Sequence, residues 1–461
     1  MKKLFVILGF FCTCSALSQE SFTFPKDVKP LIATRWGQWY PFNALAPAVE
    51  HDGMKVRPAA GCGAVAMAQI VNFHKYPCYS PDGEYEYKWD LMYHRASHDL
   101  RDDQIVSVAK LISDCGVSAF TKYGKEESGS SLRNLMNGLK RLYGYSDYIG
   151  IYNRNRYTTA KGDSIFRMML FKELEAGRPV LYRGYKKGEN DGHLFIIDGC
   201  KKDKVHVNFG WAGKDDDYYR LDDLNGYTDQ HWMLVGVADS TFVPAITAIH
   251  LDHAGTLKDS LTTQQQSEIQ HIQLSGPVNG DDLRILANMS RTGVLSSVNL
   301  RDADIETIPD SAFFSRTLLT YFILPSRCIR IGKNAFEGCI NLNRVVFPEG
   351  LKYICSNAFR NCVSLISPQL PDSLETIGQC AFYQCDGVFH FVIPKHVWKI
   401  ENSAFSNCQN LLSVSLPASL RLSSSQLVRK CPKLKRYTID PNNKVFVIEG
   451  TELKLKNNQK K

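Results

Sequence analysis

The pattern of apolar and polar positions divides the chain into a first half of mixed periodicity and a second half with one fixed period. In the first half, apolar residues recur three and four positions apart over residues 104–114, 130–143 and 165–175. This spacing places the apolar side chains on one face of a helix, so three packed amphipathic helices are predicted. The run that starts at Val180 is of β type and predicts a strand after the third helix.

Two further apolar runs predict a β-hairpin. Residues 194–197 are continuously apolar, residues 205–211 alternate, and the polar turn Lys202–Asp203 lies between them. A hairpin centred on this turn places positions 209–212 opposite positions 193–196. The residue just before the first strand is therefore expected at the open end of the hairpin.

The second half carries a repeat of 23 residues. Ala-Phe pairs begin at positions 312, 335, 358, 381 and 404; prolines stand at 325, 348, 371, 394 and 417, and cysteines at 339, 362, 385, 408 and 431. Several coincident ladders on one step predict a solenoid in which each coil buries its apolar face against its neighbours. The cysteine ladder then predicts a column of buried, reduced thiols, because equivalent positions on successive coils pair poorly as disulfides.

Composition fits a soluble globular protein of two or three domains. The chain has 461 residues, of which 44% are hydrophobic and 22% charged, and the excess of 55 basic over 47 acidic residues is modest and spread out. This balance gives no reason to expect nucleic acid as a partner. Lys2-Lys3, an apolar stretch and small residues near position 18 resemble a secretory signal, which is too short to span a membrane.

One cysteine outside the ladder is a candidate nucleophile. Cys62 follows the structure-breaking residues Pro58 and Gly61 and precedes a helix-favouring run, so it is expected at a helix N-terminus. Free amide donors and the helix dipole at that position favour the thiolate, which is the nucleophilic form of cysteine. The alternative is that Cys62 is a small buried core residue, as most single cysteines are.

Other polar residues qualify as partners of this thiol. The predicted hairpin places His193 beside Asn208, Phe209 and Trp211, so an imidazole is expected next to an amide and under aromatic cover. Upstream, Gln38 offers an amide donor of the kind that stabilises an oxyanion. Each of these residues, taken alone, is also compatible with a structural role.

No metal site and no cofactor are predicted. His94 and His98 have the spacing of zinc ligands on a helix, but no third ligand accompanies them. The acidic run 215–217 is expected to be a solvated turn. No glycine-rich phosphate loop and no serine-nucleophile elbow occur in the sequence.

The first half resembles the streptopain family of secreted, papain-like cysteine proteases. The resemblance rests on the blocks Trp36-Gly37-Gln38, Ala60-Gly61-Cys62 with Ala68-Gln69-Ile70, His74-Lys75-Tyr76-Pro77, Gly192-His193 and Val207-Asn208-Phe209-Gly210-Trp211. It implies Cys62 as nucleophile, His193 as general base and acid and Gln38 as oxyanion donor, with Asn208 or its neighbours orienting or shielding the histidine. Phe209 stands where the family usually has a tryptophan. The family's inhibitory prodomain is not evident before Trp36, so latency is expected to come from another source.

The second half resembles BspA-type leucine-rich repeats with an N-terminal cap, which implies protein recognition without naming a ligand. The predicted domains are a signal peptide at 1–18, an α+β papain-like catalytic domain at 19–240, a linker and cap at 241–299, a leucine-rich-repeat solenoid at 300–440 and a basic tail at 441–461. The whole predicts a secreted or cell-surface bacterial cysteine endopeptidase that cleaves proteins, with repeats that bind host or matrix proteins. An inactive surface adhesin is the alternative.

Overall fold

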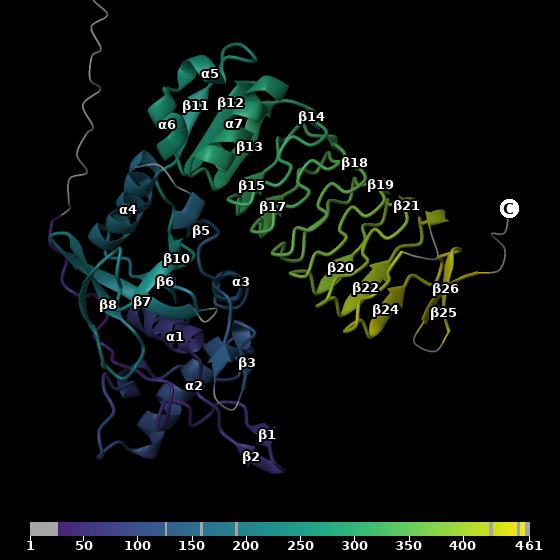
Figure 1. Cartoon of the computed structure of the whole chain (residues 1–461). Helices are drawn as coiled ribbons and strands as arrows, with labels where there is room; N and C mark the ends of the chain where they lie inside the picture. Colours follow the sequence, from purple (N-terminus) through teal and green to yellow (C-terminus); the bar gives the residue numbers. More distant parts are fainter. Residues whose placement is uncertain are drawn as a thin grey trace, which may run out of the picture.

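The computed structural model describes residues 26–124, 127–156, 160–189, 192–423, 427–449 and 452–456. The predicted signal peptide, residues 1–18, lies outside these ranges. An α+β part, purple to teal in Figure 1, is followed by a stack of coils drawn in green to yellow. Within the described ranges, no helix is both long enough and apolar enough to cross a membrane.

The α+β part is built on a six-stranded antiparallel sheet with the strand order β5-β10-β6-β7-β8-β9. Its strands are β5 (Gly150–Asn153), β6 (Val180–Lys186), β7 (Gly192–Lys201), β8 (Lys204–Asn208), β9 (Asp217–Arg220) and β10 (Tyr227–Val235). The other elements are α1 (Cys62–His74), α2 (Asp102–Ser118), α3 (Leu132–Leu142), α4 (Ala160–Glu175), the 3-10 turns η1 (Trp89–Leu91) and η2 (Arg154–Arg156), and the ribbons β1 (Val49–His51) with β2 (Met54–Val56) and β3 (Lys122–Tyr123) with β4 (Ser128–Gly129). The three predicted helices are confirmed as α2, α3 and α4.

Strand β7 is covered on both faces, which explains its continuous apolar run. Leu194 and Ile196 belong to a core shared with α1, α2 and α3, whereas Phe195 and Ile197 belong to a second core under α4. Figure 1 shows α1 and α4 on opposite sides of the strands between them. Successive side chains of a strand point to opposite faces of the sheet. Since each face of β7 is covered by helices, both sets of residues are buried.

The predicted hairpin of β7 and β8 is confirmed, but its predicted register is wrong by one residue. Lys201 pairs with Lys204 as expected, whereas Ile196 pairs with Asn208 because the ladder is interrupted at Asp198. The carboxylate of Asp198 is buried, where it accepts hydrogen bonds from Ile32 N (2.9 Å) and His206 Nδ1 (2.6 Å). Such a bulge changes the alignment of every residue beyond it.

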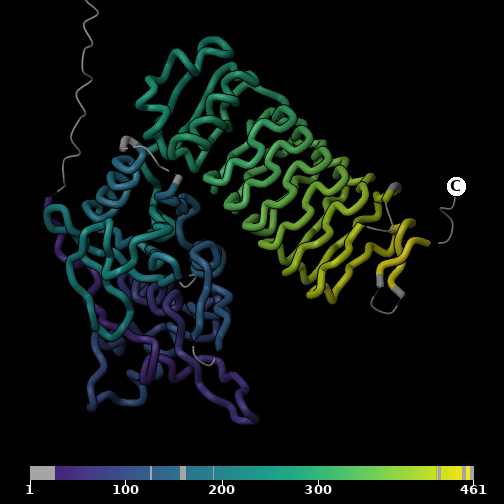
Figure 2. Tube along the Cα trace, in the orientation of Figure 1, coloured from purple at the N-terminus to yellow at the C-terminus, as the bar shows by residue number. Residues whose placement is uncertain are grey.

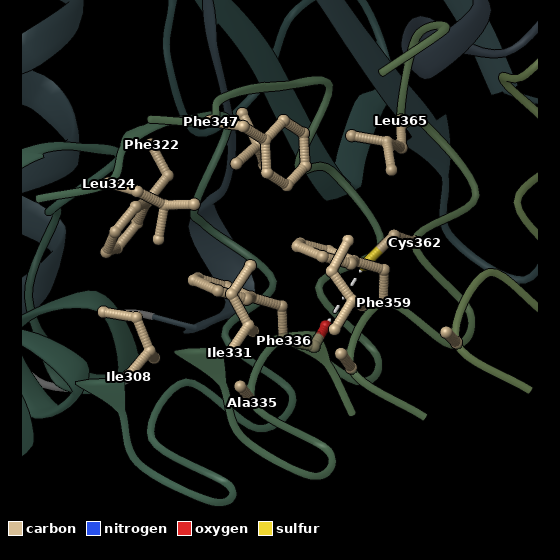
Figure 3. Close-up of a cluster of buried hydrophobic side chains, with 14 of the residues drawn as sticks. Ile308, Phe322, Leu324, Ile331, Ala335, Phe336, Phe347, Phe359, Cys362 and Leu365 are labelled. Carbon is tan, nitrogen blue, oxygen red and sulfur yellow. Dashed lines mark hydrogen bonds between the residues drawn. The ribbon is translucent and has the colours of Figure 1, made fainter. Parts of the chain in front are cut away.

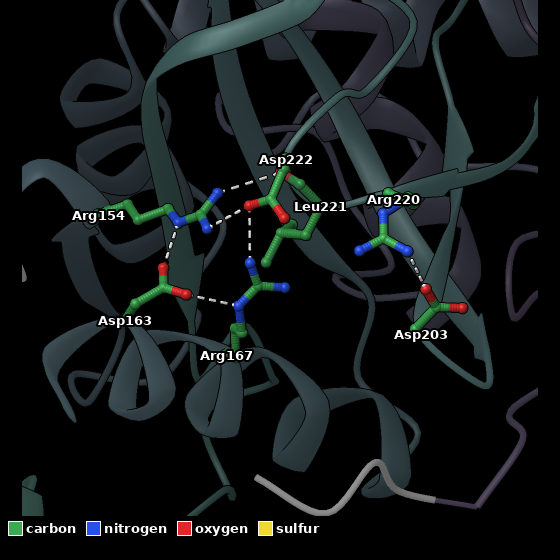
Figure 4. Close-up of polar contacts among 7 residues, drawn as sticks. All are labelled: Arg154, Asp163, Arg167, Asp203, Arg220, Leu221 and Asp222. Carbon is green, nitrogen blue, oxygen red and sulfur yellow. Dashed lines mark hydrogen bonds and ion pairs between the residues drawn. The ribbon is translucent and has the colours of Figure 1, made fainter. Parts of the chain in front are cut away.

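A four-membered ion network ties α4 to the sheet (Figure 4). Asp163 of α4 pairs with Arg154 and Arg167, at 2.6 Å in both cases, and Asp222 pairs with the same two guanidinium groups at 2.6 and 2.7 Å. Burial raises the pKa of each carboxyl, but the hydrogen bonds and charges of the two arginines lower it by a larger amount. Both carboxyl pKa values therefore lie below the ordinary one.

Parallel strands line the stacked coils in three sheets. One contains β11 (Thr247–His250), β12 (His271–Pro277), β13 (Ser297–Asp304), β15 (Tyr321–Ile323) and β17 (Arg344–Val346); a second contains β14 (Thr307–Ile308), β16 (Arg330–Ile331), β18 (Tyr353–Ile354), β19 (Thr376–Ile377), β21 (Lys399–Ile400) and β23 (Leu422–Ser423); a third contains β20 (His390–Val392), β22 (Ser413–Leu416) and β24 (Arg436–Ile439). Helices α5 (Leu257–Ser260), α6 (Thr263–Glu268) and α7 (Gly280–Thr292) lie in the first coils. Successive strands of the second sheet begin 23 residues apart, as the repeat predicts.

The phenylalanine ladder forms a continuous stack in the centre of the coils. Adjacent rings of Phe313, Phe336, Phe359, Phe382 and Phe405 lie 5.2–5.9 Å apart and within 15° of parallel. The part of the stack in Figure 3 shows the rings of Phe336 and Phe359 lying over one another. Each coil therefore buries its aromatic side chain against the next coil, as expected for a solenoid.

The cysteine ladder runs beside this stack, and all its thiols are free. Cys362 Sγ donates to the carbonyl oxygen of Phe336 at 3.1 Å (Figure 3), and the other ladder thiols donate to the equivalent carbonyl of the preceding coil at 3.0–3.4 Å. Burial raises the pKa of Cys339 to about 12 and that of Cys362 well above its usual value. Cys339 and Cys362 are therefore protonated packing groups.

The first and third sheets are separated by a single coil. Pro368 occupies the position that Val345 has one coil earlier and Phe391 one coil later, and residues 367–369 form no strand. Because proline has no amide N–H, it removes a hydrogen bond from the parallel ladder at this point.

The C-terminal end differs from the predicted basic tail. Strands β25 (Phe446–Glu449) and β26 (Glu452–Leu455) form an antiparallel hairpin, and Val445 and Phe446 are buried in the core of the coils. The apolar residues Val445 and Phe446 therefore close the end of the stack, within the segment predicted as a basic tail.

The two parts of the chain are in contact where one continues into the other. Tyr152 Oη of β5 donates to the carbonyl of Val294 at 3.2 Å, and the ring of Tyr148 packs edge-on against Tyr321 at 5.3 Å. The trace in Figure 2 shows the coils starting beside the α+β part and then running away from it at an angle.

Candidate active site

Cys62 is the first residue of α1, as predicted, and its position depends on the glycine before it. Gly61 has φ 94°, a conformation that favours glycine, and a side chain there would meet the carbonyl oxygen of Ser128 at 3.1 Å. No acidic residue lies in the first turn of α1 to oppose the dipole. The thiol is partly buried at the positive end of a long apolar helix.

The pKa of the Cys62 thiol is shifted in the opposite direction to those of Cys339 and Cys362. Burial raises the pKa of the Cys62 thiol. The interaction with His193, together with the backbone amides of Leu194 and Gly63, lowers this pKa by a larger amount. The net pKa lies below the usual value of a thiol. The lowered pKa favours the thiolate form of Cys62 beside His193.

The backbone around His193 selects its tautomer. His193 Nε2 lies 2.8 Å from the carbonyl oxygen of Phe209, and a carbonyl can only accept, so Nε2 carries a proton. In the neutral ring this leaves Nδ1 without a proton and able to accept one. The Phe209 carbonyl thus supplies the hydrogen bond that orients the His193 ring.

Aromatic rings enclose the imidazole of His193. Trp211 lies 4.8 Å from it, Tyr227 5.8 Å, Phe195 5.9 Å and Phe209 6.2 Å, measured between ring centroids. Phe209 is fully buried and stacks under Trp211 at 4.9 Å and 15°. The direct cover therefore comes from Trp211, and the smaller ring at position 209 supports the indole from below.

The side chain of Asn208 bonds elsewhere. It donates to Thr34 O at 2.8 Å and to Gln69 Oε1 at 3.3 Å, and its Oδ1 accepts from Gln69 Nε2 and Gly210 N, both at 3.1 Å. The structure thus places the predicted orienting amide in a buried network behind the site, whereas its neighbour Phe209 contacts His193.

Gln38 lines the same pocket as Cys62 and His193. This pocket has a volume of about 730 Å³, and its lining also includes Trp39, Ser128 and Trp211. The carbonyl of Gln38 accepts from Ala60 N at 2.8 Å, which fastens the glutamine to the segment that leads into Cys62. The structure thus brings the predicted nucleophile, base and amide donor around one cavity.

Two residues that support the site were not predicted for this role. Gln69, buried on α1, accepts from Thr34 Oγ1 and Trp36 N and so connects the helix of Cys62 to the segment that carries Gln38. Asp216 Oδ1 accepts from Phe209 N at 2.9 Å, and burial raises the pKa of its carboxyl. The sequence signal that could have indicated this role is that Gln69 is a polar residue within the otherwise apolar, buried run of α1. The reading of 215–217 as merely solvated is wrong for Asp216.

The structure gives no support to a metal site at His94 and His98. Both lie in a loop rather than on a helix. Across the described part of the chain, no group of three or more histidine, cysteine, aspartate or glutamate side chains is arranged to hold a metal ion.

Comparison with known proteins finds the same two parts. Residues 36–219 match the Peptidase C10 family, and residues 306–435 and 387–449 match the BspA type leucine-rich repeat region. Streptopain of Streptococcus pyogenes serotype M28 (strain MGAS6180) is 29% identical over 235 residues, which cover 43% of this chain and 56% of streptopain. The thiol protease/hemagglutinin PrtT of Porphyromonas gingivalis is 24% identical over 275 residues, 50% of this chain and 30% of PrtT. The chain thus spans about half the length of the streptopain it matches.

Among solved structures, active interpain A cysteine protease of Prevotella intermedia is 30% identical, with a TM-score of 0.41, and the match covers 47% of this chain and 97% of that one. The sequence matches define a class, a cysteine-peptidase domain followed by leucine-rich repeats. Residues 36–219 thus form a domain of the Peptidase C10, or streptopain, family.

Proposed function

We propose that this protein is a cysteine endopeptidase that hydrolyses protein substrates through an acyl-enzyme. The observation that supports this most strongly is that Cys62, at the N-terminus of α1, and His193 line the same open pocket, where His193 lowers the pKa of the Cys62 thiol. The family match supports the same activity. The α+β part is then a papain-like catalytic domain, within residues 19–240, and the coils of 300–440 a leucine-rich-repeat solenoid.

The residues perform distinct steps in this proposal. The Cys62 thiolate attacks the carbonyl carbon of the scissile amide, and Gln38 with the first amide groups of α1 stabilises the oxygen as it becomes negative. His193, protonated in the ion pair, gives its proton to the leaving amine, which departs and leaves the acyl group on sulfur. A water molecule then gives one proton to His193 and attacks the thioester as hydroxide, which releases the carboxylic acid and restores the Cys62 thiolate beside protonated His193. The carbonyl of Phe209 holds the ring orientation throughout.

The experiment that tests this proposal uses a thiol-directed epoxide and casein. We expect the reduced protein to cleave casein and to be labelled by the epoxide at Cys62, and the Cys62→Ala variant to do neither. Cys78→Ala is the matched control, because Cys78 is exposed and does not line the pocket. A wild-type protein that is neither active nor labelled at Cys62 would disprove the proposal.

Export and surface binding form a second part of the proposal. The signal-like segment at residues 1–18 and the family of the repeats support a secreted or surface-attached enzyme whose coils bind host or matrix proteins. Recovery of the protein from the culture medium with an N-terminus near residue 19 is the expected result. Retention in the cell with residues 1–18 intact would contradict export.

A further inference from the structure

A second cavity lies between the α+β part and the coils, away from Cys62. It has a volume of about 420 Å³ and shares no lining residue with the pocket of Cys62 and His193. Its walls come from α3 and the turn at Phe120 on one side and from four successive coils on the other. The proposed proteolytic activity makes no use of it.

Ionic and polar contacts hold the two walls of this cavity together. Arg133 Nε of α3 donates to Asn341 Oδ1 at 3.0 Å, and Arg344 pairs with Asp147 at 2.7 Å. Arg133 also lines the cavity. These contacts join residues about two hundred positions apart, so the cavity depends on the docking of the coils against α3.

The cavity is positively charged. Arg133, Arg141 and Lys433 contribute three cations to its lining, and Asp386 is the one carboxylate there. Asp386 is committed to its own coil, because its Oδ1 accepts from Gln409 N at 3.0 Å, and burial raises its pKa. The lining therefore favours an anionic ligand.

The guanidinium of Arg141 is held by aromatic rings and keeps its hydrogen-bonding edge free. Its central carbon lies 3.8 Å from the centroid of the Phe389 ring and 5.6 Å from that of Phe120. A stacked guanidinium still directs its N–H groups outward in its own plane. Arg141 Nε is buried and has no hydrogen-bond partner among the described residues.

A second buried polar atom stands one helical turn away. Asn137 Oδ1 is likewise without a partner in the described part of the chain, and Asn137 lines the cavity. Because residues four apart on a helix lie on the same face, Asn137 and Arg141 face one ligand together. The pair offers one acceptor and one charged donor, so it suits a ligand that carries a carboxylate and, close to it, an N–H group.

We propose that this cavity binds a peptide carboxylate, held by Arg141 and Lys433, while a neighbouring peptide N–H donates to Asn137. Both an acidic side chain and a C-terminal carboxylate place an amide N–H beside a carboxylate. The ligand bridges the two parts of the chain, because Arg141 belongs to α3 and Lys433 to a distant coil. This inference does not depend on the proposed proteolytic activity.

The test measures peptide binding to full-length Cys62→Ala protein, in which the proposed nucleophile is absent. Three acetylated peptides are compared by calorimetry: one with glutamates and an amidated C-terminus, its glutamine counterpart, and that counterpart with a free C-terminal carboxyl group. We expect at least one carboxylate peptide to bind about tenfold or more tightly than the amidated glutamine peptide. Whichever carboxylate peptide binds more tightly shows whether the cavity prefers an acidic side chain or a C-terminal carboxylate.

Charge-removing variants locate the site. Lys433→Gln changes an exposed side chain and is expected to weaken binding about fivefold or more, and Arg141→Gln about tenfold or more. Lys435→Gln is the matched control, because Lys435 is exposed on the same coil and does not line the cavity. Equal binding of all three peptides, unchanged binding in both cavity variants, or full displacement by equimolar inorganic phosphate would each overturn the proposal.

Discussion

Replacing Asn208 by alanine tests whether this residue acts on His193 directly or through the fold. In the structure its side chain bonds Thr34 O, Gly210 N and both ends of the Gln69 amide, and it is almost fully buried. Alanine removes the Asn208 partner of Thr34 O, of Gly210 N and of Gln69 Nε2, whereas Gln69 Oε1 still accepts from Thr34 Oγ1 and Trp36 N. At about 1 kcal/mol for each neighbour, we expect Asn208→Ala to lower the free energy of unfolding of the catalytic domain by about 3 kcal/mol.

The same structure predicts a small effect on the chemistry of the folded protein. The carbonyl of Phe209 remains in place because Asp216 still accepts from Phe209 N at 2.9 Å, so the hydrogen bond to His193 persists. The rate of Cys62 alkylation at pH 6, measured far below the unfolding transition, is expected to change by no more than about threefold.

Denaturant unfolding followed by tryptophan fluorescence measures the stability, since five of the six tryptophans precede residue 240. Asn72→Ala, a partly exposed change on α1 outside this network, is the control. A stability loss below about 1 kcal/mol, combined with alkylation slowed more than about tenfold, would show that Asn208 orients the histidine itself.

Three further predictions concern the thiol, the ion network and the coils. Because His193 lowers the pKa of Cys62, the reactivity of the thiol is expected to persist at mildly acidic pH and to fall only as the pH drops through that lowered pKa. His193→Ala should therefore slow the alkylation of Cys62 at pH 6 by about tenfold or more. An unchanged alkylation rate would refute the interaction of Cys62 with His193. Asp163→Asn should cost about 1–2 kcal/mol at pH 7, a modest figure because the carboxylates are partly solvated. Since the pKa values of Asp163 and Asp222 are lowered on folding, this contribution is present above their ordinary values and is lost as the pH falls below them, so an equal effect at pH 2 and pH 7 would contradict it. Phe359→Ala removes a ring that stacks between two others at centroid distances of 5.2 and 5.4 Å. It should lower the free energy of unfolding of the coils by about 3–5 kcal/mol, measured by denaturation followed by circular dichroism. A loss below about 1 kcal/mol would show that the stacked rings do not stabilise the coils.

The sequence by itself determined the elements whose causes are local or periodic. Helices α2 to α4 follow from their apolar spacing, and the stacked coils follow from a period that repeats the same packing at every step. The position of Cys62 at the start of α1 follows from the glycine before it and the helix formers after it. In each case neighbouring residues along the chain carry the physical reason.

Tertiary structure decided everything that depends on segments distant along the chain. The ladder is interrupted at Asp198, whose carboxylate bonds Ile32 N and His206. Beyond the hairpin, the Phe209 carbonyl, and not the Asn208 amide, lies at His193. The contact of α3 with the coils likewise joins residues that no local pattern relates. Burial of a polar group is tolerated only where a partner reaches it, and that partner is specified by the fold rather than by sequence neighbours.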